Sequence, residues 1–124
     1  MSYLLDTQIF LWAYAGHRRL NAETRRLIAS APSYVSVVSA WETAIKVSIG
    51  KLSFRGSFEE AVDVSGFLKL GLTFRHTDAT LALPFHHRDP FDRLLLAQAI
   101  TEGLVLLTAD AAFAAYGGPI HVVK

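Results

Sequence analysis

Apolar and polar residues follow one another in blocks that predict strands alternating with helices. Short runs of aliphatic and β-branched residues are typical of buried strands, as in LVLLT at 104–108. Longer runs with apolar residues at helical spacing and a Gly at the end predict helices, as in FDRLLLAQAITE at 91–102. The pattern predicts strands at 2–5, 34–39, 72–75, 104–108 and 119–123, and helices at 7–15, 21–31, 39–49, 57–70, 79–84, 91–102 and 109–116.

This alternation predicts an α/β fold. Parallel strands need long crossover connections, and helices in those connections cover both faces of the sheet. The chain has 124 residues, an ordinary size for one domain, and it shows no internal repeat or Pro/Gly-rich linker. We therefore expect a single domain over residues 1–124.

Four acidic residues lie where predicted strands give way to helices or in the first turns of helices. Asp6 and Asp110 follow predicted strands, Glu42 lies about one turn into the helix after the second strand, and Asp92 opens the helix at 91–102. Charges so close to apolar sequence need neutralisation. If the fold gathers the four, their repulsion favours either protonation or a bound divalent cation. Carboxylate oxygens are ligands that Mg²⁺ and Mn²⁺ prefer.

Each acid also has a local structural interpretation, and these alternatives remain open. Asp6, Asp89 and Asp110 are suitable helix N-caps. Glu42 has Lys46 four residues later, so the two can pair on one helix face.

Two other groups of polar residues bear on the site. Thr7 and Thr108 flank two of the acids and are candidate donors of hydrogen bonds that support the metal ligands, although local capping is a competing role. His86 and His87 are adjacent, which does not match the spacing of a helical zinc motif, and the chain has no Cys. We interpret the two histidines as solvent-facing turn residues.

Composition and charge bear on the partners and the cellular location of the protein. Hydrophobic residues make up 52% of the chain, so we expect some apolar surface to contact another chain; a well-filled core is the alternative. The net charge of +1 gives no global signature of nucleic-acid binding. The sequence has neither an apolar run long enough to span a membrane nor the features of a signal peptide, and a cytoplasmic location is expected.

Four blocks, in this order, resemble the PIN-domain nucleases and especially the VapC-type toxins of bacterial toxin–antitoxin pairs. The blocks are YLLDT, SAWETAIKVSIGKL, HRDPFDRLLLAQA and LVLLTAD, and the third is the most specific. The resemblance implies a three-layer α/β/α fold with a central, mainly parallel sheet. It assigns Asp6, Glu42, Asp92 and Asp110 to an acidic pocket, and Asp92 matches the third acid of the family better than Asp89 does.

The resemblance further implies an endoribonuclease that hydrolyses RNA phosphodiester bonds with Mg²⁺ or Mn²⁺. Asp6 and Asp92 are then the expected direct ligands, Asp110 binds the metal or a metal-bound water, and Glu42 orients or deprotonates the attacking water. Arg88 and Arg93 are the basic residues nearest in sequence to these acids and are candidate RNA contacts.

The resemblance also implies a homodimer and a small cognate antitoxin protein as partner. Two alternatives remain. One is a non-catalytic PIN-like module for dimerisation or RNA binding, and the other is a receiver-like protein with an acidic Mg²⁺ site. Retention of all four acids favours catalysis, and the lack of an acidic pair around the first strand disfavours the receiver-like interpretation.

Overall fold

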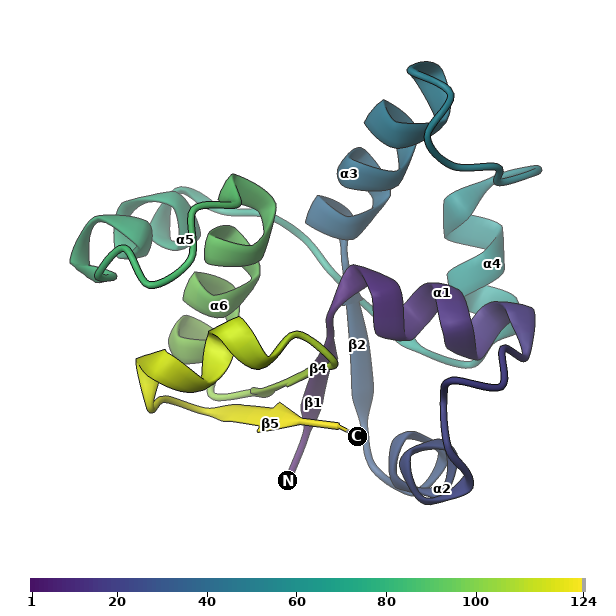
Figure 1. Cartoon of the computed structure of the whole chain (residues 1–124), viewed down its shortest axis with the longest axis horizontal. Coiled ribbons are helices and arrows are strands. Elements are labelled where there is room, and N and C mark those ends of the chain that lie inside the picture. Colours follow the sequence, from purple (N-terminus) through teal and green to yellow (C-terminus); the bar gives the residue numbers. More distant parts are fainter. Residues whose placement is uncertain (124) are drawn as a thin grey trace.

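A five-stranded parallel sheet forms the centre of the molecule. The computed structural model describes residues 1–123. The strands run in the order β3-β2-β1-β4-β5, and every neighbouring pair is parallel. Figure 1 labels β1, β2, β4 and β5 among the surrounding helices. Their bounds are β1 Tyr3–Leu5, β2 Ser33–Ser36, β3 Leu68–Leu70, β4 Val105–Thr108 and β5 Ile120–Val122.

Helices cover both faces of this sheet. The α-helices are α1 Thr7–Ala15, α2 Ala22–Ser30, α3 Val37–Ser48, α4 Phe58–Val64, α5 Phe74–Ala79 and α6 Pro90–Glu102, and two 3₁₀ segments are η1 Thr80–Ala82 and η2 Ala111–Tyr116. Helices α1, α2 and α4 pack on one face, whereas α3, α6 and η2 pack on the other. The expected three-layer α/β/α architecture is confirmed.

Alternation within the central strands divides the core into two clusters. Leu5 and Leu107 face the layer of α1, α2 and α4, whereas Leu4 and Leu106 face the layer of α3 and α6. All four side chains are fully buried. A strand buried on both faces has apolar residues at successive positions, which is why LVLLT reads as a continuous apolar run rather than an alternating one.

The region between α4 and α5 differs from the sequence-based prediction. A helix was expected over 57–70 and a strand over 72–75, but α4 ends at Val64 and the strand is β3 at 68–70. Gly66 has a φ of +78°, a left-handed conformation that interrupts the helix. Thr73 then caps α5 in a capping box with His76, so 74–79 is helical. The helix α3 also begins earlier than predicted, at Val37, because Ser36 is its N-cap.

A buried polar cluster joins α3, α5 and α6. Gln98 of α6 is fully buried, and its Oε1 accepts a hydrogen bond from the Ser36 hydroxyl at 2.5 Å. Its Nε2 donates to the Gly71 carbonyl at 3.2 Å and lies 3.4 Å from Nδ1 of buried His76. Since Ser36 caps α3, this cluster sets α3 against α6, the two helices that carry Glu42 and Asp92.

Several large apolar side chains remain on the surface. They include Trp41, Phe74, Leu81 and Phe85, which are between 62% and 89% exposed. Within residues 1–123, no helix is both long and apolar enough to cross a membrane.

Candidate metal centre

Two of the four acids meet at the carboxyl edge of neighbouring strands. Strands β1 and β4 pair in register with Leu5 opposite Leu107, and the Asp6 amide donates to the Leu107 carbonyl at 2.9 Å. Asp6 therefore leaves the sheet beside Thr108, two residues before Asp110. This edge is where ligands bind in open parallel sheets.

Asp6 and Asp110 serve as helix caps as well as site residues. Oδ1 of Asp6 accepts the Gln8 amide at 3.0 Å, and Oδ1 of Asp110 accepts the Ala112 amide at 2.9 Å. In each carboxylate a second oxygen is left for other partners. The capping interpretation is thus confirmed for both residues, and it does not compete with a role in the site.

Glu42 comes from the opposite side, on α3, and both of its oxygens are held. The Thr7 hydroxyl donates to Oε1 at 2.7 Å, and Nζ of Lys46 lies 2.7 Å from Oε2. The side chain is buried, so the predicted pair with Lys46 partly neutralises a carboxylate that water barely reaches.

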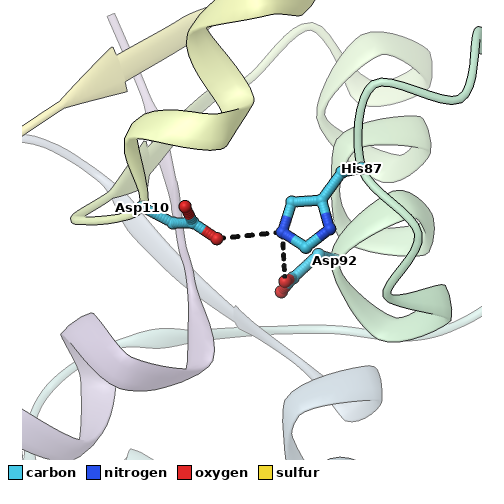
Figure 2. Close-up of side chains that lie close together, drawn as sticks. All are labelled: His87, Asp92 and Asp110. Carbon is cyan, nitrogen blue, oxygen red and sulfur yellow. Dashed lines mark hydrogen bonds and ion pairs between the residues drawn. The ribbon is translucent and has the colours of Figure 1, made fainter.

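The helix α6 contributes two acids with different roles. Oδ1 of Asp89 accepts the amides of Phe91 at 2.8 Å and Asp92 at 3.2 Å, which makes Asp89 the N-cap. Asp92 lies in the first turn and does not cap the helix; its carboxylate points toward Asp110 (Figure 2). Its side chain is 15% exposed, compared with 44% for Asp110.

These acids line one cavity, which we call the acidic cavity. It has a volume of about 540 Å³. Its lining comprises Asp6, Thr7, Gln8, Leu11, Glu42, Lys46, Lys51, Leu52, Asp89, Asp92, Ala109 and Asp110. The structure thus brings together all four acids expected at the site and adds Asp89.

Two other hollows are larger but chemically less distinctive. Among the residues that the structure describes, a groove of about 840 Å³ beside α2 and β3 has Arg25 as its one charged lining residue, and another of about 660 Å³ beside α2 and β5 has Glu23 as its one acid. A volume alone does not identify a site; convergent polar groups with perturbed pKa values do. The acidic cavity has convergent polar groups, and several of them have perturbed pKa values.

Burial and mutual repulsion perturb the acids of the cavity. The pKa of Asp92 is raised to about 7, first by burial and then by the charges of Asp6 and Asp89, while His87 opposes the shift. Burial likewise raises the pKa of Asp6, against the effect of its hydrogen bond from Thr108. The pKa of Asp110 is lowered, first by the Ala112 amide and then by His87. Two carboxyls of this cavity therefore resist ionisation unless a positive charge joins them.

The donor set fits a hard divalent cation. The cavity offers carboxylate oxygens from α3, α6 and the segments that follow β1 and β4, and oxygen ligands are those that Mg²⁺ and Mn²⁺ prefer. Asp6, Asp92 and Asp110 line this cavity beside Glu42, whose carboxylate already has the Lys46 ammonium as its cationic partner.

The hydroxyl donors expected from the sequence are confirmed. Thr108 donates to Oδ2 of Asp6 at 2.5 Å and accepts the Asp110 amide at 3.0 Å. Thr7 donates from the first turn of α1 to Glu42 on α3. Both threonines are buried, so these bonds are shielded from water.

His87 is the residue of this site that the sequence interpretation missed. The expectation of a solvent-facing turn holds for His86, which is exposed, but it is wrong for His87. The His87 side chain is 15% exposed, and its Nε2 lies 3.0 Å from Oδ2 of Asp92 and 2.9 Å from Oδ2 of Asp110 (Figure 2). Its position in the HHRDP turn carries no signal of this contact, because Asp110 lies on a distant segment.

Arg93 does not lie where an RNA contact is expected. It is buried, and its guanidinium donates to the carbonyls of Thr80 at 3.1 Å, Leu83 at 3.2 Å and Pro84 at 2.8 Å. Because the carbonyls occupy its donors, Arg93 fastens the segment before α6 rather than facing a ligand. Arg88, by contrast, is exposed.

A known protein family and several solved structures resemble this chain. A family model described as PIN domain matches residues 3–119. A search of curated proteins found no match.

Three solved structures have similar folds. One is described as VapBC2 from Rickettsia felis bound to a DNA fragment from their promoter: the TM-score is 0.72 at 18% identity, with 99% of this chain and 98% of that chain covered. A toxin–antitoxin complex from Klebsiella pneumoniae has a TM-score of 0.67 at 19% identity, with 97% of this chain and 96% of that chain covered. DNA-bound VapBC from Salmonella typhimurium has a TM-score of 0.67 at 17% identity, with 99% of this chain and 97% of that chain covered. At these identities the likeness concerns the fold.

Proposed function

The chain belongs to the PIN-domain family, and on that premise we propose that it is an endoribonuclease that hydrolyses RNA phosphodiester bonds with a divalent metal. Proteins of this family are generally nucleases. The observation that supports the proposal most directly is the convergence of Asp6, Glu42, Asp92 and Asp110 on one cavity at the carboxyl edge of β1 and β4.

The proposed metal is Mg²⁺ or Mn²⁺, with Asp6, Asp92 and Asp110 as its ligands. The raised pKa of Asp92 and of Asp6 supports this assignment, because a cation would relieve the repulsion that opposes their ionisation. When bound, such a metal activates water and neutralises charge on the phosphoryl oxygens.

Glu42 is proposed to orient the attacking water or to accept its proton. The hydrogen bond from Thr7 and the ion pair with Lys46 fix the carboxylate at the wall of the cavity. Since Lys46 already supplies a positive charge to this carboxylate, a direct ligand role is the less favoured one for Glu42.

The RNA backbone needs positive groups around this acidic centre. Lys46 and Lys51 line the cavity, and Arg88 is exposed in the turn before Asp89. We assign phosphate contacts to these three residues. Arg93 is left out, because its guanidinium is bound to backbone carbonyls.

The biological role we propose is that of a VapC-type toxin that acts in the cytoplasm with a small antitoxin protein as its partner. The structures with similar folds, described as VapBC or toxin–antitoxin complexes, support this role. The exposed apolar side chains on α3 and α5, Trp41 and Phe74, support a homodimer. Light scattering tests that state, and a persistent monomer at high concentration would contradict it.

A cleavage assay tests the nuclease proposal. Purified protein is incubated with total RNA in Mg²⁺, Mn²⁺ or EDTA, beside Asp6→Asn and Asp92→Asn. As a matched control, Asp78→Asn changes an exposed acid on α5, outside the cavity. We expect cleavage only with metal, loss of cleavage in both cavity variants, and full activity in the control. Cleavage in EDTA, or cleavage that survives both cavity substitutions, would reject the mechanism and favour a non-catalytic module.

A further inference from the structure

The ring of His87 has one nitrogen facing the protein backbone and the other facing two carboxylates. Nδ1 accepts the Asp89 amide at 3.2 Å. A neutral imidazole has one donor and one acceptor nitrogen, so an amide donating to Nδ1 leaves the proton on Nε2. Nε2 is hydrogen-bonded to Oδ2 of Asp110 at 2.9 Å and lies 3.0 Å from Oδ2 of Asp92 (Figure 2).

The ring is held in this position by its surroundings. The main-chain amide of His87 donates to the Tyr116 hydroxyl at 3.0 Å, and the ring lies 5.1 Å, centroid to centroid, from the fully buried ring of Phe113. Tyr116 and Phe113 both belong to η2, the 3₁₀ segment that Asp110 caps. His87 and Asp110 are therefore packed against the same element.

The hydrogen bond from the Asp89 amide to Nδ1 argues against His87 as a metal ligand. A neutral imidazole that binds a metal through Nε2 must carry its proton on Nδ1. That proton would point at the Asp89 amide, placing one donor against another. The ring as it lies is suited to donate to carboxylates and not to bind the metal itself.

Of the two carboxylates, that of Asp110 depends more on the contact with His87 for its orientation. Its side chain is 44% exposed, its Oδ1 is used by the Ala112 amide, and its charge repels that of Asp6. Without a donor on the cavity side, solvation and repulsion would favour a carboxylate turned outward, as in an ordinary helix cap.

We infer that His87 is a positioning residue of the metal site, whose Nε2–H bridges Asp92 and Asp110 and holds both carboxylates toward the same cation. This inference rests on the proposed function, because it takes the two aspartates as metal ligands. Partners that orient metal ligands typically contribute a factor of about 10–100 in metal affinity.

Mn²⁺ binding tests the inference without recourse to activity. Free Mn²⁺ is measured by electron paramagnetic resonance during titration of wild type, His87→Ala, His87→Gln and His86→Ala. Gln offers an amide N–H at a reach similar to that of Nε2, whereas His86 is exposed and outside the cavity lining. We expect His87→Ala to bind Mn²⁺ about 10–100-fold more weakly, His87→Gln to recover part of that loss, and His86→Ala to match wild type.

Three outcomes would overturn the inference. Equal or tighter Mn²⁺ binding by His87→Ala would show that the ring competes with the cation. Spin-echo modulation from an imidazole nitrogen bound directly to Mn²⁺ would make His87 a ligand. A His87→Gln variant that is folded by circular dichroism but binds as weakly as His87→Ala would reject the N–H donor.

The design separates this inference from the proposed function. Failure of the wild-type protein to bind Mn²⁺, or unchanged binding in Asp92→Asn, would reject the proposed metal site itself. Normal wild-type binding that Asp92→Asn weakens and His87→Ala leaves unchanged would reject the role of His87 alone.

Discussion

The Thr108 hydroxyl donates a 2.5 Å hydrogen bond to Oδ2 of Asp6 across 102 residues of sequence. The hydroxyl oxygen of Thr108 in turn accepts the Asp110 amide at 3.0 Å, so the Thr108 side chain links the acids that follow β1 and β4. The bond is buried and favours the charged form of Asp6, because it lowers a pKa that burial raises. The acids of the cavity thus depend on donors that come from other segments of the chain.

Replacing Thr108 by Val should destabilise the protein, because it leaves the Asp6 carboxylate without its buried donor. We expect a loss of about 1–3 kcal/mol in the free energy of unfolding, measured by urea titration in EDTA. The loss should be larger at pH 8 than at pH 5, since the bond stabilises ionised Asp6. Thr108→Ser keeps the hydroxyl and should stay close to wild type. A Val variant as stable as wild type would contradict the contribution assigned to this hydrogen bond.

The stability of the metal-free protein should fall as the pH rises toward 8. The pKa of Asp92 is raised from 3.8 to about 7, so the folded state holds this proton more tightly than the unfolded state. Its contribution is therefore complete below pH 4 and is lost as the pH rises through about 7. The raised pKa of Asp92 corresponds to at most about 4 kcal/mol of stability, and solvent screening reduces this to about 2 kcal/mol. The pKa of Asp6 is also raised, so this residue affects stability in the same direction.

Asp92→Asn provides the check on that pH dependence. Urea unfolding in EDTA at pH 5 and pH 8 should show a smaller difference in the variant than in wild type, and the variant should be the more stable of the two at pH 8. Asp78→Asn, outside the cavity, should keep the wild-type slope. A variant that is less stable than wild type at pH 8 would indicate that the Asp92 carboxylate stabilises the fold.

Gln98→Leu should cost stability although it replaces a buried polar side chain by an apolar one. The Ser36 hydroxyl would lose its acceptor in a part of the core that water does not reach, and the Gly71 carbonyl would lose a partly buried donor. We expect a loss of about 1–3 kcal/mol in the free energy of unfolding. Gln8→Leu, at an exposed position, should change it by less than about 0.5 kcal/mol. Equal effects of the two substitutions would contradict the role assigned to the buried cluster.

Arg93→Lys should loosen the segment that precedes α6. A lysine ammonium cannot reproduce the planar set of donors that holds the carbonyls of Thr80, Leu83 and Pro84. Hydrogen exchange measured by mass spectrometry should show lower protection at 80–88 and unchanged protection in β1 and β4. Arg88→Lys, at an exposed position, serves as the control. Unchanged exchange at 80–88 would show that other contacts hold the segment.

The sequence predicted the strands and helices whose apolar pattern is unambiguous. LVLLT forms β4, and the helix at 91–102 is α6 with one more residue at its start. The third strand was misplaced, because β3 is short, lies at the edge of the sheet and is largely exposed. An edge strand with little burial has no strong hydrophobic pattern to mark it. Hydrogen bonding to β2 defines it instead.

By itself the sequence determined which chemistry the protein offers: acids directly after buried strands, hydroxyls beside them and no thiol. Only the tertiary structure decided which groups meet. Placing β1 beside β4 brings Asp6, Thr108 and Asp110 to one edge, and the turn before α6 then directs His87 at Asp92 and Asp110. The physical reason is that helix caps and apolar periodicity are local and can be read along the chain. Hydrogen bonds between distant segments depend on strand order and helix packing, which the local pattern does not contain.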